Sequence, residues 1–315
     1  MRDLRIVFMG TPAFAVTILS SILQQKYNVV GVVTAPDKPA GRGRKINESA
    51  VKKFAIEKNL PVLQPTNLKS EAFIKELIGL KPNVQVVVAF RMLPKLVWQL
   101  PSLGTFNLHA SLLPQYRGAA PIHWAIINGE EKTGTTTFFI DEKIDTGAMI
   151  LQNEVMIQDD ETVGSLHDKL MNKGADLVLD TLRLIQQAKI ETTLQPQNEI
   201  LKEAPKLNRE NTKIDWSDSL NNIYNKIRGL DPFPAAWTTL VQGDKEEPLK
   251  IFGVQKEIAN HNHTTGKIIV SKKEFKIAVQ DGYINCLELQ LPGKRKMKVT
   301  DLLNGLQFTA DAYVR

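Results

Sequence analysis

The sequence predicts an α/β fold with a doubly wound, Rossmann-like and mostly parallel sheet, followed by a small C-terminal β-barrel of the OB-like kind. Short apolar segments alternate with helical patterns in the first half of the chain, and a polar stretch without sustained periodicity follows. Several short strands with turns lie beyond that stretch. We therefore expect a first domain over residues 1–188, a linker over 189–207 and a barrel domain over 208–315.

The first predicted βα unit lies at the N-terminus. Residues 5–10 form an apolar strand that meets a glycine, after which Thr11 can cap a helix and Pro12 can occupy its first turn. Further apolar segments are expected to form strands, with helical patterns between them: 29–33, 61–63 and 84–88. Strands that alternate with helices predict a parallel sheet covered on both faces.

Two later predicted strands are each followed by a segment of polar residues. Asn107 and His109 lie at the end of a strand expected over 104–108, and a strand over 135–140 ends immediately before the phrase that contains Asp145. A doubly wound sheet usually binds ligands beyond the carboxyl ends of its strands. Both phrases are therefore expected where chemistry takes place.

The second half of the chain begins with a long amphipathic pattern. Residues 161–187 have helical spacing and should close the first domain, while 188–206 are polar and indicate a linker. One helix over 217–228 is then followed by short strands, expected at 236–241, 249–254, 266–270, 275–279 and 284–291. An open barrel of this kind often presents a surface to nucleic acid.

Composition limits the classes of protein that fit. With 43% hydrophobic and 23% charged residues among 315, the chain has ordinary globular composition, and its apolar runs are shorter than the ~20 residues of a membrane helix. We expect a cytoplasmic monomer without a cleaved signal or membrane segment. The single cysteine, Cys286, excludes an intramolecular disulfide and a cysteine-cluster zinc site, and is expected to be buried. The net charge of +6 favours a polyanionic partner.

Three residues carry the predicted chemistry. Asn107 and His109 are two apart on an extended segment, so their side chains point to the same side and can converge on one atom. The amide can donate to an oxygen that gains negative charge, the imidazole can shuttle a proton, and the carboxylate of Asp145 can orient it. Each residue alone could instead be structural, as a satisfied histidine, a turn asparagine and a turn cap.

The run at 106–122, FNLHASLLPQYRGAAPI, resembles the signature of the folate-dependent formyltransferase family, and Asp145-Thr146-Gly147 is similar to that family's second motif. The likeness narrows to the branch that acts on initiator tRNA through further segments: 8–15, 36–45, 214–217, 229–237 and 301–305. It therefore covers nearly the full chain. The resemblance implies that Asn107, His109 and Asp145 form the catalytic trio.

The resemblance also implies a folate co-substrate, 10-formyltetrahydrofolate. The residues themselves give no reason to expect a metal. The folate contacts are expected along Ser111, Leu112, Leu113 and Pro114, with the 89–93 loop bordering the pterin slot. Many members of the family carry Tyr-Gly where this chain has Phe90-Arg91, so Arg91 could meet an anionic part of a ligand. A tryptophan is commoner in the family than Tyr116, and either residue keeps an aromatic surface.

Two basic clusters are candidate RNA contacts. A glycine-containing loop at 38–45 can approach phosphates closely, although from the residues alone a solvated loop fits better. The resemblance implies that this loop enters the acceptor end of tRNA, with contacts from Arg42, Arg44 and Lys45. A second cluster, at Lys294, Arg295 and Lys296, follows a Pro-Gly turn and is a phosphate track or a set of solvated turn charges.

The expected function is transfer of the formyl group of 10-formyltetrahydrofolate to the α-amino group of methionine on initiator methionyl-tRNA, the expected partner. Alternatives are a formyltransferase for a sugar nucleotide or glycinamide ribonucleotide, a hydrolase that releases formate, and a non-catalytic tRNA-binding protein. The basic loop and the full-length likeness favour the tRNA substrate. Binding alone gives no reason for all three catalytic residues. Gly10-Thr11-Pro12 is no dinucleotide fingerprint, which argues against nicotinamide chemistry.

Overall fold

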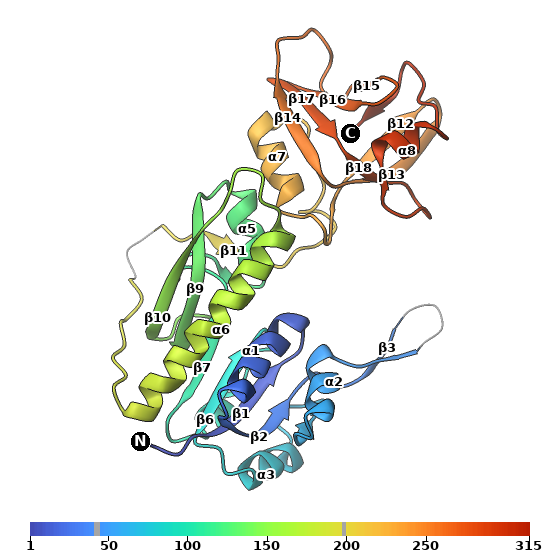
Figure 1. The fold of residues 1–315 in the computed structure, drawn as a ribbon. Coiled ribbons are helices and arrows are strands. Elements are labelled where there is room, and N and C mark those ends of the chain that lie inside the picture. Colours follow the sequence, from blue (N-terminus) through green and yellow to red (C-terminus); the bar gives the residue numbers. More distant parts are fainter. Residues whose placement is uncertain (41–44, 197–199) are drawn as a thin grey trace. The chain divides into compact units, whose positions relative to one another are not determined.

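The structure, a computed structural model, describes residues 1–40, 45–196 and 200–315. The chain divides into two compact units. Unit 1 comprises residues 1–118, 133–155 and 168–203, and unit 2 comprises residues 119–132, 156–167 and 204–315. Unit 1 holds the large sheet, and unit 2 holds two smaller ones (Figure 1).

The large sheet has seven strands in the order β10-β9-β7-β6-β1-β2-β5. Their bounds are β1 Arg5–Gly10, β2 Asn28–Val33, β5 Val62–Leu63, β6 Val84–Val88, β7 Thr105–His109, β9 Lys132–Phe139 and β10 Met149–Met156. The pairs β1–β2, β1–β6, β2–β5 and β6–β7 are parallel, whereas β7–β9 is antiparallel. The prediction of a doubly wound, mostly parallel sheet is confirmed.

Burial on both faces explains the composition of the central strands. All five residues of β6, VQVVV, are buried, as expected for a parallel strand covered on each side. The polar exception, Gln85, accepts a hydrogen bond from Thr105 Oγ1 at 2.9 Å. Part of the unit 1 core lies around these strands: Val7, Met9, Val33, Leu63, Leu68, Phe73, Leu77, Val87, Leu93 and Val97.

Helices of unit 1 lie on the faces of this sheet (Figure 1). They are α1 Ala13–Gln24, α2 Ala50–Glu57, α3 Glu71–Gly79, α4 Lys95–Trp98 and, from residue 168 onward, α6 Val163–Gln187. Helices α1 and α6 touch where Thr17 Oγ1 lies 3.1 Å from Met171 Sδ. The expected cap by Thr11 is wrong, because Pro12 occupies the N-cap position and no side chain caps α1.

Short paired strands, β3 Lys38–Ala40 and β4 Lys45–Asn47, flank the basic segment that the sequence predicted as a loop. The carboxylate of Asp37, just before β3, accepts hydrogen bonds from Lys52 Nζ and from Gln64 Nε2, the latter at 2.8 Å. The hydrogen bond from the Lys52 ammonium is the main cause of a lowered pKa of Asp37. These contacts anchor the base of the segment to α2.

Strand β10 was not predicted. Its sequence, MILQNEVM, carries Gln152, Asn153 and Glu154 in the middle, and its residues are mostly half-buried or exposed. An edge strand needs less apolar surface than a central one, so the hydrophobic alternation is weak. Two short strands, β8 Arg117–Gly118 and β11 Glu203–Ala204, also went unpredicted.

Unit 2 contains helices α5 Pro121–Ile127, α7 Leu220–Arg228 and α8 Val299–Leu303. Its five-stranded sheet has the order β19-β18-β13-β12-β20, and its four-stranded sheet the order β14-β17-β16-β15. The strands are β12 Ala236–Gln242, β13 Lys245–Ile251, β14 Val254–Ile258, β15 Ile268–Val270, β16 Phe275–Val279, β17 Gly282–Cys286, β18 Glu288–Gln290, β19 Met297–Lys298 and β20 Tyr313–Val314. This arrangement agrees with the small C-terminal β domain expected from the sequence.

Two predicted strands of unit 2 are each divided between sheets. The segment expected at 249–254 includes the end of β13, a break at Phe252-Gly253 and the start of β14. Leu287 likewise separates β17 from β18, and its backbone N–H donates to Gly253 O at 2.8 Å. Adjacent apolar residues hide such a break, because both sheets bury their side chains in one core.

Cys286 lies in that core with 1% of its surface exposed, and burial raises the pKa of its thiol well above the usual value. The expectation of a buried cysteine is confirmed.

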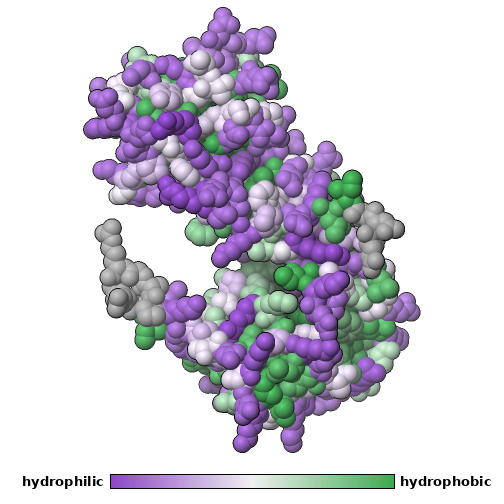
Figure 2. Space-filling model, turned by 180° about the vertical axis from the view of Figure 1, so that it is seen from behind, coloured by the Kyte–Doolittle hydropathy of each residue, from purple (hydrophilic) through white to green (hydrophobic). Residues whose placement is uncertain are grey.

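On the face shown in Figure 2, the surface of residues 204–315 is mainly hydrophilic. No helix among the described residues is both long and apolar enough to cross a membrane.

Candidate active site

Strand β7 positions two of the three predicted catalytic residues. Asn107 pairs in register with Val87 on β6 and with Phe138 on β9, so its backbone is held on both sides. His109 is the last residue of the same strand and its side chain is 8% exposed. Because the two positions are two residues apart on one strand, their side chains share a face of the sheet.

The amide of Asn107 is half-buried. Its Oδ1 atom is buried and accepts no hydrogen bond from any residue that the structure describes. The amide nitrogen is therefore the part of this side chain that can donate to a bound molecule.

A backbone carbonyl fixes the ring of His109. Nε2 lies 2.8 Å from the carbonyl oxygen of Tyr116, which can only accept, so Nε2 carries a hydrogen. The other nitrogen, Nδ1, faces Asp145 with a separation of 3.8 Å from Oδ2. The two ring nitrogens thus have different tasks: one orients the ring and the other faces the carboxylate.

Asp145 is placed by the backbone around it. Its φ of 55° lies in the left-handed region, and its Oδ2 accepts a hydrogen bond from the Gly118 N–H at 3.0 Å. A separation of 3.8 Å is too long for a direct hydrogen bond to His109. Asp145 is an ion-pair partner of that ring when the ring is protonated.

The reason given for this convergence in the sequence prediction was wrong. Strand β9 runs antiparallel to β7, so Phe139 at its end lies opposite Phe106, near the start of β7, while His109 lies opposite Thr136. The carboxyl ends of β7 and β9 are at different edges. Asp145 comes near His109 because the loop after β9 folds back.

Gly147 makes this fold-back possible. A Cβ atom built on Gly147 would lie 1.7 Å from the carbonyl oxygen of Phe139, far inside van der Waals contact. The loop is further tied by Thr146 Oγ1, which donates to Asp141 Oδ1 at 2.8 Å. In the Asp-Thr-Gly motif, the aspartate therefore supplies the charge, the threonine holds the loop through its hydrogen bond to Asp141, and the glycine lacks the Cβ atom that would collide in the turn.

Gln195 supports the same loop and was missed by the sequence prediction. Its Nε2 donates to the carbonyl oxygens of Asp145 and Gly147, both at 2.9 Å. Its Oε1 accepts from Arg117 Nη2 at 2.6 Å, and the residue is 7% exposed. No signal marked it, since it is a polar residue in a polar stretch predicted as linker, 50 positions after Asp145.

The expected folate segment, Ser111 to Pro114, is held against the sheet. Leu113 N–H donates to Thr136 Oγ1 at 3.2 Å, and Leu113 O accepts from Gln152 Nε2 at 2.8 Å. Ser111 is fully buried and its hydroxyl donates to Gln115 O at 2.6 Å. With its buried polar atoms satisfied, the segment forms a fixed wall near His109.

Arg91, where the chain departs from the family pattern, is engaged with backbone rather than free for a ligand. Its guanidinium donates to the carbonyl oxygens of Pro65 and of Thr66, the latter at 3.0 Å. It also lies 5.6 Å from the centre of the Phe90 ring. Arg91 therefore fastens the 89–93 loop to the neighbouring 65–66 segment.

The expected tRNA contacts are only partly described. Arg42 and Arg44 lie outside the described residues, and Lys45 pairs through its backbone with Ala40. Lys294 and Arg295 are exposed between β18 and β19. Lys296 instead forms an ion pair with Glu288 at 2.7 Å.

Over the ranges that the structure describes, no group of three His, Cys, Asp or Glu residues could hold a metal ion.

The sequence matches the models of known protein families. A family model described as formyl transferase matches residues 4–182, and one described as the formyl transferase C-terminal domain matches residues 206–307. The chain belongs to the formyl transferase family. The sequence prediction of a formyltransferase, an enzyme that moves a one-carbon group, is confirmed.

Relatives and solved structures agree with this assignment. A relative from Flavobacterium johnsoniae named methionyl-tRNA formyltransferase is 58% identical over 314 residues, with 100% of each chain covered. One of the same name from Bacteroides thetaiotaomicron is 51% identical, covering 99% of this chain and 98% of the relative.

Solved structures share the fold at lower identity. HypX from Aquifex aeolicus, in complex with tetrahydrofolic acid, has a TM-score of 0.66 at 17% identity over 96% of this chain, which spans 47% of HypX. An N-formyltransferase from Helicobacter canadensis, with folinic acid and dTDP-3-aminofucose, has a TM-score of 0.63 at 20% identity, covering 90% of this chain and 98% of that protein. At such identities the likeness concerns the fold alone.

Proposed function

We propose that this formyltransferase moves the formyl group of 10-formyltetrahydrofolate to the α-amino group of methionine esterified to initiator tRNA. The observation that carries the proposal is the approach of Asp145 to His109, 3.8 Å apart, on the face of β7 that also holds Asn107. The choice of acceptor is supported by the full-length relative that is 58% identical and named methionyl-tRNA formyltransferase.

The acceptor amine needs little activation. An α-amino group has a reference pKa of ~7.7 to 8.0, and esterification of the neighbouring carboxyl lowers it, so a large neutral fraction exists near neutral pH. The lone pair of this nitrogen attacks the formyl carbon and forms a new C–N bond. Strong base catalysis is unnecessary before this step.

Attack creates an oxyanion on the former formyl oxygen. The amide nitrogen of Asn107 and Nδ1 of the protonated His109 ring, which is too far from Asp145 for a direct hydrogen bond, donate to this oxygen and stabilise its charge. Asp145 stabilises the charged ring and, through water, accepts the proton that leaves the attacking nitrogen. When the oxyanion collapses, the bond to the folate nitrogen breaks, and that nitrogen leaves with the proton that Asp145 took from the amine and returns through water.

The donor lies along the wall formed by Ser111, Leu112, Leu113 and Pro114. This assignment follows the family motif, and the rigid tethering of Leu113 to Thr136 and Gln152 supports it. A fixed wall holds the formyl carbon at a constant distance from His109. The folate complexes of HypX and of the Helicobacter canadensis enzyme support a folate donor of the same general class.

The tRNA is held by cations rather than by base stacking at the two basic clusters. From the sequence we assign phosphate contacts to Arg42, Arg44 and Lys45, and to the exposed Lys294 and Arg295, with Lys296 shared with Glu288. By the same proposal residues 1–188 are the catalytic domain, 189–207 the linker and 208–315 the tRNA-binding domain. The enzyme acts as a monomer on a substrate of the cytoplasmic translation machinery.

One assay tests the acceptor. The purified protein receives 10-formyltetrahydrofolate labelled in the formyl carbon, together with methionyl initiator tRNA, methionyl elongator tRNA, a sugar nucleotide carrying an amine, or buffer alone. We expect label on the initiator methionyl-tRNA, with far less on the elongator. Label that appears instead on the sugar nucleotide, or as formate at the same rate without acceptor, contradicts the proposal.

A further inference from the structure

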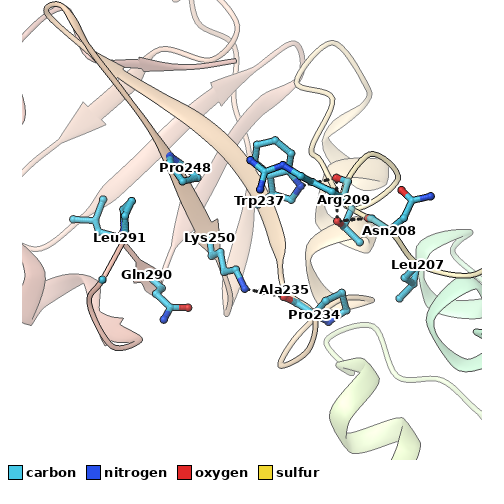
Figure 3. A pocket seen from close by; sticks show the side chains of 13 residues that line it. Leu207, Asn208, Arg209, Pro234, Ala235, Trp237, Pro248, Lys250, Gln290 and Leu291 are labelled. Carbon is cyan, nitrogen blue, oxygen red and sulfur yellow. Dashed lines mark hydrogen bonds between the residues drawn. The ribbon is translucent and has the colours of Figure 1, made fainter. Parts of the chain in front are cut away.

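An open hollow in unit 2 is lined by none of the residues assigned to catalysis. Its volume is about 440 Å³, within the ~300–1,000 Å³ of small-ligand pockets. It is bounded by the start of β12, by β13, by the turn after β18 and by the segment around Arg209 (Figure 3). Its walls include Arg209, Trp237, Lys250, Pro234, Pro248 and Leu291.

A guanidinium and an indole form a pair on one wall. The guanidinium carbon of Arg209 lies 4.4 Å from the centre of the Trp237 ring, and Figure 3 shows the two side chains against each other. The indole nitrogen donates to the carbonyl oxygen of Arg209 at 2.7 Å, which fixes the ring. The pair therefore offers a wide, flat and fixed surface.

The hydrogen-bond donors of this pair are not all used. Among the described residues the guanidinium of Arg209 has no hydrogen-bond acceptor and no ion-pair partner. An arginine that keeps its donors free while its plane is held by an aromatic ring is prepared to receive an anion. The exposed side chain of Arg209 makes this anion site reachable from solvent.

The rest of the lining has the same sign of charge. Lys250 lies beside Trp237, as its register partner on the neighbouring strand β13, and donates to Pro234 O at 3.2 Å (Figure 3). No Asp or Glu of the described chain lines the hollow. Lys213 does not line the hollow, but its ammonium lies 5.7 Å from the centre of the Trp237 ring. Pro248 and Leu291 supply apolar surface between the charges.

We propose that this hollow binds one unpaired nucleotide of the RNA substrate. The base stacks on the Arg209–Trp237 pair, and its phosphate pairs with the free donors of Arg209 and Lys250. Single-stranded RNA is commonly recognised in this way, by stacking on aromatic rings or guanidinium planes together with backbone charge. A run of acidic residues could use the cations but brings no aromatic ring to stack on the flat surface. The inference rests on the proposed tRNA substrate.

The kinetic part of the test uses full-length enzyme and three variants. Trp237→Leu removes the flat surface, and Arg209→Lys keeps the charge but loses the plane. We expect the KM for methionyl-tRNA to rise about tenfold in each, because base stacking of this kind is worth that much, while kcat and the KM for 10-formyltetrahydrofolate stay unchanged. Lys273→Ala, an exposed cation between β15 and β16, is the control and should change nothing.

Tryptophan fluorescence gives a readout that does not depend on turnover. Uncharged initiator tRNA should quench the wild-type emission, and Trp237→Phe should lose that quenching yet keep most of the affinity, since a phenyl ring still stacks. Arg209→Lys changes an exposed side chain and should fold normally. Wild-type KM and full quenching in both Trp237 and Arg209 variants would overturn the proposal. If the wild type formylates no methionyl-tRNA, the proposed function fails separately, and the quenching titration still decides on the nucleotide site.

Discussion

The carbonyl oxygen of Tyr116 lies 2.8 Å from Nε2 of His109. This hydrogen bond uses Nε2 to orient the ring, so the other ring nitrogen, Nδ1, faces Asp145. Tyr116 itself has a φ of 60° and is 5% exposed, so its backbone is held by packing in a conformation that L residues rarely adopt. The tight segment before Tyr116 is thus part of the proposed catalytic geometry as well as the expected wall of the folate site.

Removing either oxyanion donor should nearly abolish turnover. Asn107→Ala and His109→Ala should each lower kcat by about 10²- to 10³-fold, because one such donor contributes ~3–4 kcal/mol to the barrier. The measurement is single-turnover formylation with circular dichroism as a check of folding. His263→Ala, an exposed histidine of unit 2, is the matched control and should keep normal turnover. Comparable rates for His263→Ala and His109→Ala would remove His109 from the mechanism.

Gln195 should behave as a positioning residue. Gln195→Leu leaves the carbonyl oxygens of Asp145 and Gly147 without their donor, so Asp145 can move away from His109. We expect kcat to fall about tenfold with little change in the KM for methionyl-tRNA, and a loss of ~1–3 kcal/mol in the free energy of unfolding. Gln187→Leu, on an exposed residue at the end of α6, should do neither. Equal kcat values for Gln195→Leu and Gln187→Leu would show that the Asp145 loop keeps its position without the hydrogen bonds from Gln195.

The fold-back of the Asp145 loop should depend on Gly147. Gly147→Ala places a Cβ 1.7 Å from Phe139 O, so the loop must shift, and the free energy of unfolding should fall by about 2–4 kcal/mol together with activity. The control is Gly79→Ala, where a Cβ meets no atom within 4 Å and stability should be unchanged or slightly higher. Urea unfolding of both variants measures the difference, and equal stabilities would refute the packing argument.

The base of the basic segment should show a pH dependence. The pKa of Asp37 is lowered mainly by the Lys52 ammonium, so the carboxylate form is favoured in the folded state. Its contribution to stability is full above the ordinary carboxyl pKa and is lost as the pH falls through the lowered one. Lys52→Ala should raise the pKa of Asp37 toward its ordinary value in a carboxyl NMR titration. Lys53→Ala, on the exposed side of α2, should leave it unchanged, and a shift of equal size there would contradict the assignment.

Periodicity predicted the central elements well. Strands 84–88 and 275–279 match β6 and β16, because mainly apolar, buried runs of this length leave a clear pattern. Periodicity did not predict β10, because the polar residues in the middle of this strand show no regular alternation. It also placed 249–254 in one strand, since apolar residues at a corner between sheets look like any buried strand.

The sequence proposed the residues of the candidate site but did not predict how the fold brings them together. Motif resemblance selected Asn107, His109 and Asp145, but the antiparallel direction of β9 and the return of the 140–148 loop follow from tertiary pairing that no local pattern encodes. The role of Tyr116 O depends on a backbone atom, which every residue has. The support from Gln195 depends on a contact across 50 positions.

The rate of formyl transfer in Asp145→Asn tests the central claim most directly. With both 10-formyltetrahydrofolate and methionyl initiator tRNA saturating, the single-turnover rate should fall at least about a hundredfold, because an amide cannot stabilise the charged imidazole or accept the amine proton. The Kd values for both substrates should stay unchanged. A folded Asp145→Asn enzyme that transfers formyl at nearly the wild-type rate would contradict the account.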